Sequence, residues 1–89
     1  MIVRWSETAG EDLKNIFEYI ARDKPDAASA TVEMLLQAGE GLMRYPSMGR
    51  SGRHNGTREL VHAPFVIVYS IVGEVINIHA VLHGSRKYT

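Results

Sequence analysis

Residues 65–72 (FVIVYSIV) and 75–82 (VINIHAVL) are two strongly apolar stretches, and only Gly73 and Glu74 separate them. A two-residue connection of this kind makes a tight reversal, so the pair predicts an antiparallel β-hairpin. The first stretch is apolar on both faces, which requires a central strand that is covered on most of both sides. One face carries Phe65, Ile67, Tyr69 and Ile71, and the other carries Val66, Val68, Ser70 and Val72.

The alternation of side chains along the second stretch divides it into an apolar and a mixed face. We expect the apolar face, Ile76, Ile78, Ala80 and Leu82, to lie under helices, and the mixed face to carry Val75, Asn77, His79, Val81 and His83. A further strand is expected at about residues 57–62, and IVRW at residues 2–5 predicts a short N-terminal strand. Residues 46–56 are rich in Gly, Ser, Pro and Asn, which predicts a loop.

Two helices are expected between the first strand and this loop. Residues 7–22 show a helical stripe of apolar side chains, and Thr8 with Glu11 has the spacing of a capping box. A second helix should begin at Pro25, which suits the first helical position, and end before Pro46. The short connection makes the helices antiparallel neighbours. Gly39 and Gly41 in the second helix indicate a close approach to another element.

The expected fold is therefore α+β with the order β-α-α-β-β-β. The N-terminal strand and an antiparallel helical hairpin pack on one face of a small, mostly antiparallel sheet. The length of 89 residues predicts a single domain, residues 1–89. The other sheet face, half apolar and without helices, is expected to attract a partner.

Composition excludes several functional classes. The chain has no cysteine, which removes disulfides and cysteine-bearing zinc sites and suits a cytoplasmic protein. The N-terminus shows no apolar core of a signal peptide, and no apolar run reaches the ~20 residues that span a membrane. The four histidines lack ligand spacing, so neither a metal nor another cofactor is expected.

Charge is unevenly distributed although the formal net charge is zero. Residues 1–43 hold four Lys or Arg against eight Asp or Glu, whereas residues 44–89 hold six against two. The halves therefore carry −4 and +4, and the basic half favours an acidic partner.

The ordered set of motifs resembles the RelE/ParE superfamily of toxins from type II toxin–antitoxin modules, and is most similar to its ParE-like branch, the plasmid stabilisation proteins. The matching residues are Trp5, EDLKNIFEYIARDKPDAA at 11–28, YPSMGR at 45–50, GTREL at 56–60, FVIVYSI at 65–71 and INIHAVLHGSRKY at 76–88. The resemblance covers about 85 residues and implies the fold derived above.

The resemblance implies one of two targets. ParE-like proteins inhibit DNA gyrase, without an attributed hydrolytic activity, and RelE-like proteins cut messenger RNA in the ribosomal A site. It also implies a partner, an antitoxin whose extended C-terminal segment wraps the toxin. Gyrase inhibition is the preferred interpretation, because a chain of zero net charge has few groups to neutralise ribosomal RNA. A non-toxic peptide-binding module of the same fold is the remaining alternative.

The chemistry of the C-terminal tail is also compatible with a nuclease. His83 could act as base or acid, Arg58 and Arg86 could clamp a phosphate, and Tyr88 could stack on a base or donate a proton. For binding of the target or the antitoxin, the candidates are Arg50, Arg53, Arg58, Arg86 and Lys87. The competing interpretations are structural: a solvated strand end for the tail, an ion pair for Arg58, a hydrogen-bonded structural role for His79, and core positions for Tyr69 and Trp5.

Overall fold

The computed structural model of the 89-residue chain describes residues 1–84. Its elements are β1 (Ile2–Trp5), α1 (Glu7–Ala21), α2 (Pro25–Glu40), a 3-10 turn η1 (Gly41–Met43), β2 (Arg50–Ser51), β3 (Arg58–His62), β4 (Phe65–Val72) and β5 (Val75–His83). The strands form one sheet in the order β1-β5-β4-β3-β2. Within residues 1–84 only β1 and β5 pair in parallel, so the predicted α+β fold with a mostly antiparallel sheet is confirmed.

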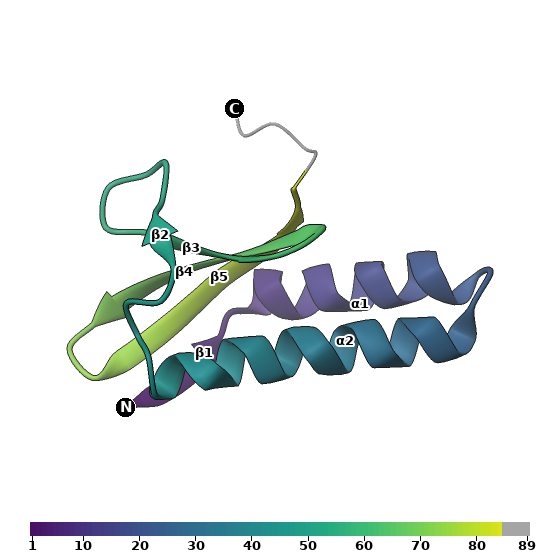
Figure 1. The fold of residues 1–89 in the computed structure, drawn as a ribbon, viewed down its shortest axis with the longest axis horizontal. Coiled ribbons are helices and arrows are strands. Elements are labelled where there is room, and N and C mark those ends of the chain that lie inside the picture. Colours follow the sequence, from purple (N-terminus) through teal and green to yellow (C-terminus); the bar gives the residue numbers. More distant parts are fainter. Residues whose placement is uncertain (85–89) are drawn as a thin grey trace.

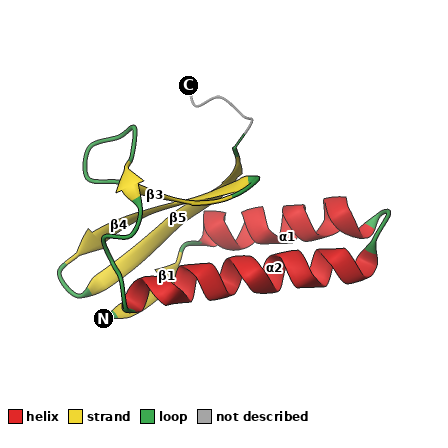
Figure 2. Ribbon diagram, viewed as in Figure 1, coloured by secondary structure: helices red, strands yellow, loops and turns green. Residues whose placement is uncertain are grey.

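The helices lie side by side as an antiparallel hairpin and cover one face of the sheet (Figure 1). The loop between β2 and β3 and the C-terminal end of β5 lie towards the opposite side (Figure 2). The core lies between the two layers and consists of Ala9, Leu13, Leu35, Leu42, Phe65, Ile67, Tyr69, Ile76, Ile78 and Val81. The core positions predicted for Tyr69 and Trp5 are confirmed, with Tyr69 fully buried and Trp5 packed against the cluster.

Gly39 shows why α2 carries a glycine in its interior. A Cβ there would lie 2.4 Å from the Trp5 ring and 2.9 Å from Cδ1 of Ile78. The predicted close approach is therefore confirmed at Gly39. It is wrong at Gly41, where a Cβ would meet nothing within 4 Å.

The N-terminus of α1 is capped differently from the sequence prediction. Ser6, not Thr8, is the N-cap, and its Oγ accepts the N–H of Ala9 at 3.0 Å. The same hydroxyl donates to the carbonyl of His79 at 3.0 Å. The Ser6 side chain thus joins the start of α1 to strand β5. The spacing of a capping box concerns the helix alone, so it cannot anticipate the contact with His79.

A β-bulge at His79 corrects the predicted faces of β5. Tyr69 pairs with Ile78, but the preceding residue Val68 pairs with Ala80, so β5 carries one extra residue. An extra residue reverses the alternation beyond it. Val81 consequently joins the core, and the helix-facing positions predicted for Ala80 and Leu82 are wrong.

The predicted loop at residues 46–56 also needs a correction. Arg50 and Ser51 form the short edge strand β2, which pairs with Glu59 and Arg58 of β3. Two paired residues are too few for a period-two pattern, so the sequence could not indicate this strand.

Candidate functional site

A buried hydroxyl is the first of three anchors that hold the segment 44–50, which connects η1 to β2. Tyr69 of β4 is fully buried, and its hydroxyl donates to the carbonyl of Pro46 at 2.7 Å. The hydroxyl also accepts the N–H of Gly49 at 2.9 Å. Because both contacts are to backbone atoms, Tyr69 fixes the path of the chain rather than the position of one side chain.

Arg58 of β3 provides a second anchor for this segment. Its Nη1 donates to the carbonyl of Gly49 at 2.8 Å and approaches that of Ser47 at 3.4 Å. The longer contact is beyond the usual range of an N–H···O hydrogen bond, so the Gly49 contact is the stronger one. Arg58 is half-buried and shares the wall of a small hollow with Ser51, Gly56, Thr57 and Ile71.

The third anchor is an ion pair between β2 and β3. Glu59 is buried at 5% exposure, and its Oε1 accepts from Nε of Arg50 at 3.2 Å and from Nη2 at 3.0 Å. The Arg50 side chain itself is 65% exposed. A buried carboxylate is costly without a partner, so Arg50 stabilises the edge of the sheet while part of its guanidinium faces solvent.

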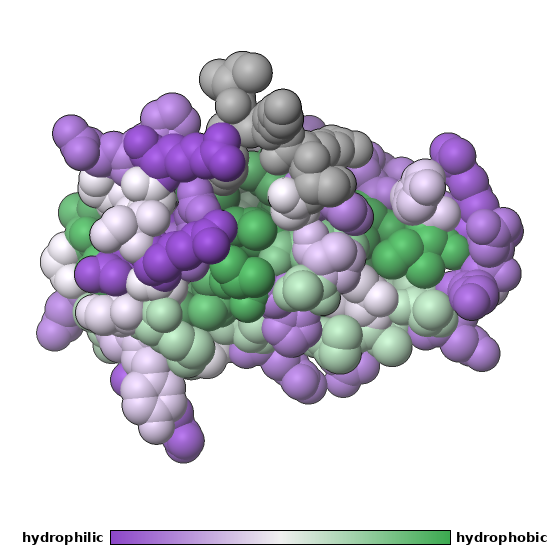
Figure 3. All heavy atoms as spheres, turned by 45° about the horizontal axis from the view of Figure 1, so that its top comes forward, coloured by the Kyte–Doolittle hydropathy of each residue, from purple (hydrophilic) through white to green (hydrophobic). Residues whose placement is uncertain are grey.

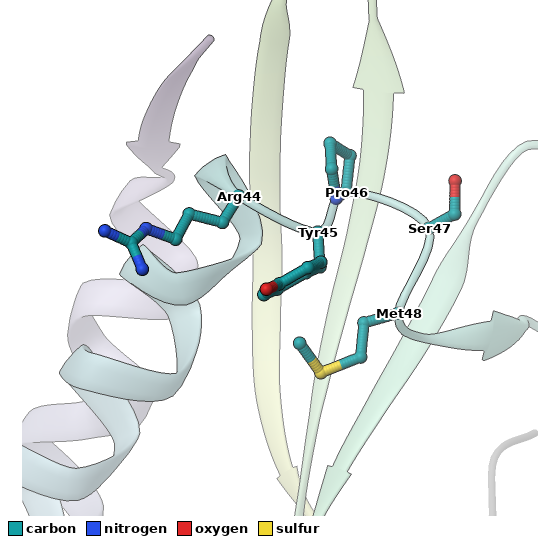
Figure 4. Close-up of a pocket in the computed structure, with 5 residues that line it drawn as sticks. All are labelled: Arg44, Tyr45, Pro46, Ser47 and Met48. Atoms are coloured by element: carbon teal, nitrogen blue, oxygen red, sulfur yellow. The ribbon is translucent and has the colours of Figure 1, made fainter.

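The outward surface of the segment is apolar. Tyr45 and Met48 line a hollow together with Arg44, Pro46 and Ser47. Their side chains extend to the same side of the loop, towards one another (Figure 4). Tyr45 is 63% exposed and Met48 54%, large values for residues of these types. The anchored backbone therefore presents two apolar side chains to solvent.

Arg53 lies in the loop between β2 and β3, next to His54, and is exposed. The loop is closed by the N–H of Gly52 on the carbonyl of Thr57 at 2.8 Å, and by the Thr57 hydroxyl on the carbonyl of His54 at 2.6 Å. Arg50, Arg53 and Arg58 thus lie on β2, β3 and their connection, so the structure brings these three predicted binding residues to one edge of the sheet.

His83 lies elsewhere, at the last position of β5. It is exposed and packs edge-to-face on Phe65, with ring centroids 5.7 Å apart. Arg58 of β3 pairs with Tyr69, and His83 of β5 pairs with Phe65. Tyr69 and Phe65 are four positions apart on β4, and β3 and β5 flank β4 along its two edges. At about 3.3 Å per residue and about 4.8 Å per strand spacing, the Cα atoms of Arg58 and His83 are roughly 16 Å apart. The structure does not bring these two together, and Arg86, Lys87 and Tyr88 lie outside the described residues.

His79 takes part in a local hydrogen bond on the sheet face without helices. Its Nε2 lies 2.7 Å from Oγ of Ser70, in agreement with the structural interpretation from the sequence. Figure 3 shows apolar side chains gathered in the middle of the molecule between hydrophilic ones.

Among residues 1–84 no group of three histidines or carboxylates could hold a metal ion, and no helix there is long and apolar enough to span a membrane.

The sequence interpretation misses the exposed pair Tyr45 and Met48, and it misses the buried residues Tyr69 and Glu59 that hold the chain beneath them. The sequence predicts a core position for Tyr69, but the partners of its hydroxyl come from another part of the chain. The available signal is Glu59, an isolated carboxylate in an arginine-rich region, since a charged residue that a strand buries usually has a partner.

Fold and sequence together place the chain among the toxins of type II toxin–antitoxin systems, in the RelE/ParE superfamily. Residues 3–88 match the family described as "ParE toxin of type II toxin-antitoxin system, parDE", and the chain belongs to this family. It is 40% identical over 88 residues to "Putative toxin Y4kP" of Sinorhizobium fredii (strain NBRC 101917 / NGR234), covering 97% of this chain and 91% of the relative.

Solved structures share the fold. A chain of the chromosomal ParDE system from P. aeruginosa superposes with a TM-score of 0.87 at 23% identity, covering 93% of this chain and 95% of that one. A chain of the RelBE2 toxin–antitoxin complex from Mycobacterium tuberculosis gives a TM-score of 0.67 at 24% identity, covering 92% and 88%. At these identities the likeness concerns the fold.

Proposed function

We propose that this toxin arrests growth by binding and inhibiting DNA gyrase in the cytoplasm, and that a cognate antitoxin neutralises it. The observation that carries the proposal is the separation of Arg58 from His83. Cleavage of RNA at a 2′-hydroxyl needs a base or acid and a phosphate clamp around one phosphodiester. Here the candidate clamp Arg58 binds the carbonyl of Gly49 at 2.8 Å and pairs with Tyr69 of β4, whereas His83 pairs with Phe65, four positions away on that strand.

The distribution of charge supports the same choice. A ribosome-directed nuclease gains much of its affinity by neutralising phosphates with lysine and arginine. The chain has a formal net charge of zero. Two of its basic residues, Arg50 and Arg58, are already engaged with the Glu59 carboxylate and with backbone carbonyls. A surface of this kind suits a protein target better than ribosomal RNA.

An antitoxin partner is supported by the family and by the solved neighbours, which come from a ParDE system and a RelBE2 toxin–antitoxin complex. We expect its toxin-binding segment to be partly disordered alone and to fold on binding. Its carboxylates should meet the basic residues Arg50, Arg53, Arg58, Arg86 and Lys87.

The test uses purified components in two parallel reactions. One contains gyrase, relaxed plasmid and the toxin, and the other contains ribosomes programmed with messenger RNA and the toxin. We expect blocked supercoiling and intact message, with activity restored by the antitoxin in the gyrase reaction. Message cut only in the presence of ribosomes would contradict the proposal and make the chain a RelE-like nuclease.

A variant of His83 makes the test more specific, because the nuclease mechanism gives this residue a catalytic role and gyrase inhibition gives it none. The variant His83→Ala should inhibit gyrase as the wild type does. If instead the wild type cuts message and His83→Ala does not, then His83, Arg58, Arg86 and Tyr88 are the residues to replace one at a time. No effect in either reaction, with retained binding of a peptide, would favour a non-toxic binding module.

A further inference from the structure

The segment 44–50 combines a fixed backbone with an exposed apolar surface. Tyr69 and Arg58 hold the backbone of Pro46 and Gly49 through three contacts between 2.7 and 2.9 Å. A loop that is already ordered in the free protein loses little conformational entropy on binding, so its contacts contribute more of their energy to affinity. A solvated connector has no need of a fully buried tyrosine hydroxyl on its main chain.

The side chains on this backbone are of the types that dominate protein interfaces. Tyrosine, methionine and arginine are enriched there, and here Tyr45 and Met48 extend together beside Arg44 (Figure 4). Such anchors are effective when a partner can cover them completely, and the hollow between these two side chains provides a place for one apolar side chain of the partner.

The charge around the segment determines the chemistry of the partner. Residues 44–58 contain four arginines and no aspartate or glutamate. Arg50 is paired with Glu59, while 65% of its side chain still faces solvent. The complementary ligand is a peptide in which an apolar residue is flanked by carboxylates.

We propose that the segment 44–50 is the docking surface for an acidic, amphipathic segment of the antitoxin, with Tyr45 and Met48 as apolar anchors. This inference rests on the proposed neutralisation by an antitoxin, but not on gyrase as the target. Tyr69 is a positioning residue in this arrangement, because it acts through the backbone of Gly49.

The experiment compares two methionine variants. Met48→Glu places a carboxylate at the anchor, with the same sign of charge as the acidic partner segment. Met34→Glu on α2 is the matched control, because Met34 is 48% exposed and Met48 is 54% exposed. The antitoxin that is co-purified with the toxin is labelled, and its dissociation constant is measured for wild type and both variants. We expect Met48→Glu to weaken binding at least about tenfold more than Met34→Glu, as loss of an interface anchor does. Equal effects, or no antitoxin binding by the wild type, would overturn the inference.

Tyr45→Ala gives a second variant that adds no charge, and it should weaken binding by a similar factor with an unchanged unfolding midpoint. Gyrase supercoiling is measured for the same proteins. If Met48→Glu weakens antitoxin binding but the wild type does not inhibit gyrase, the gyrase proposal fails and the docking surface stands. If Met48→Glu loses gyrase inhibition but keeps antitoxin affinity, the segment contacts the target instead. A concentration-dependent dimer that Met48→Glu abolishes would assign the surface to a second copy.

Discussion

The Tyr69 hydroxyl accepts the N–H of Gly49 at 2.9 Å and occupies the space that a side chain at residue 49 would need. A Cβ there would lie 2.7 Å from that hydroxyl oxygen and 2.9 Å from the carbonyl oxygen of Glu59. The glycine is therefore required by a close approach of two backbones and a ring, with no need for an unusual φ angle. Core tyrosine and loop glycine form one structural unit.

Gly49→Ala should consequently destabilise the protein. The added methyl group must displace the Tyr69 ring or strand β3, and overpacking of this kind costs about 1–3 kcal/mol of unfolding free energy. The measurement is urea denaturation followed by circular dichroism. Gly41→Ala is the control, because a Cβ at Gly41 meets nothing within 4 Å. A Gly49→Ala protein as stable as the control would show that the loop yields freely.

Tyr69→Phe separates the hydroxyl from the ring. The ring keeps its place in the core, whereas the N–H of Gly49 and the carbonyl of Pro46 lose their common partner. Leaving such groups unpaired costs about 1–3 kcal/mol each when they stay away from water. We expect faster amide exchange at Gly49, and little change at the central strand β4 beyond the global loss of stability.

Tyr45→Phe is the control for this variant, since Tyr45 is 63% exposed and lies in the same segment. It should leave amide exchange at Gly49 unchanged. Equal exchange rates at Gly49 in wild type and Tyr69→Phe would mean that the hydroxyl does not hold the loop.

Hydrophobic periodicity predicts the helices and long strands of this protein because burial imposes a repeat on every residue of an element. What it misses are contacts between one side chain and a distant backbone atom. The anchoring of Gly49 by Tyr69 is of this kind, and the bulge at His79 is a second feature that periodicity misses, because one extra residue shifts the alternation of β5. The sequence predicts a phosphate clamp for Arg58 from its residue type and its place in the motif GTREL, but its partners in the structure are carbonyls of a segment that pattern analysis treats as loop.

Asp12 of α1 accepts a backbone hydrogen bond from strand β5 at the point where the neighbouring strand β1 ends. Strand β1 stops at Trp5, opposite Ile78, and the N–H of Val81 donates to Oδ2 of Asp12 at 2.9 Å. Asp12→Ala should therefore cost about 1–3 kcal/mol of unfolding free energy, and Asp12→Asn less, because its amide oxygen can still accept. Chemical denaturation of both variants checks this, with exposed Glu11→Ala as the control. Equal losses for Asp12→Ala and Asp12→Asn would contradict a hydrogen-bonding role.

The ion pair of Arg50 and Glu59 allows a test that isolates one interaction. Arg50→Ala leaves a carboxylate of 5% exposure without its partner, whereas the same change in a Glu59→Gln background leaves only a neutral amide. We expect Arg50→Ala to cost more in the first background than in the second. Because the arginine side chain is 65% exposed and solvent screens the pair, the difference should be near 1 kcal/mol.

The four proteins of this double-mutant cycle are compared by urea denaturation at low and at high salt. A partly exposed pair should lose some of its coupling energy at high salt, but not all of it, since the carboxylate itself is shielded from the solution. Additive effects of the two substitutions at both salt concentrations would show that the contact at 3.0 Å contributes nothing to stability. In that case Arg50 would be available in full to a partner's carboxylate.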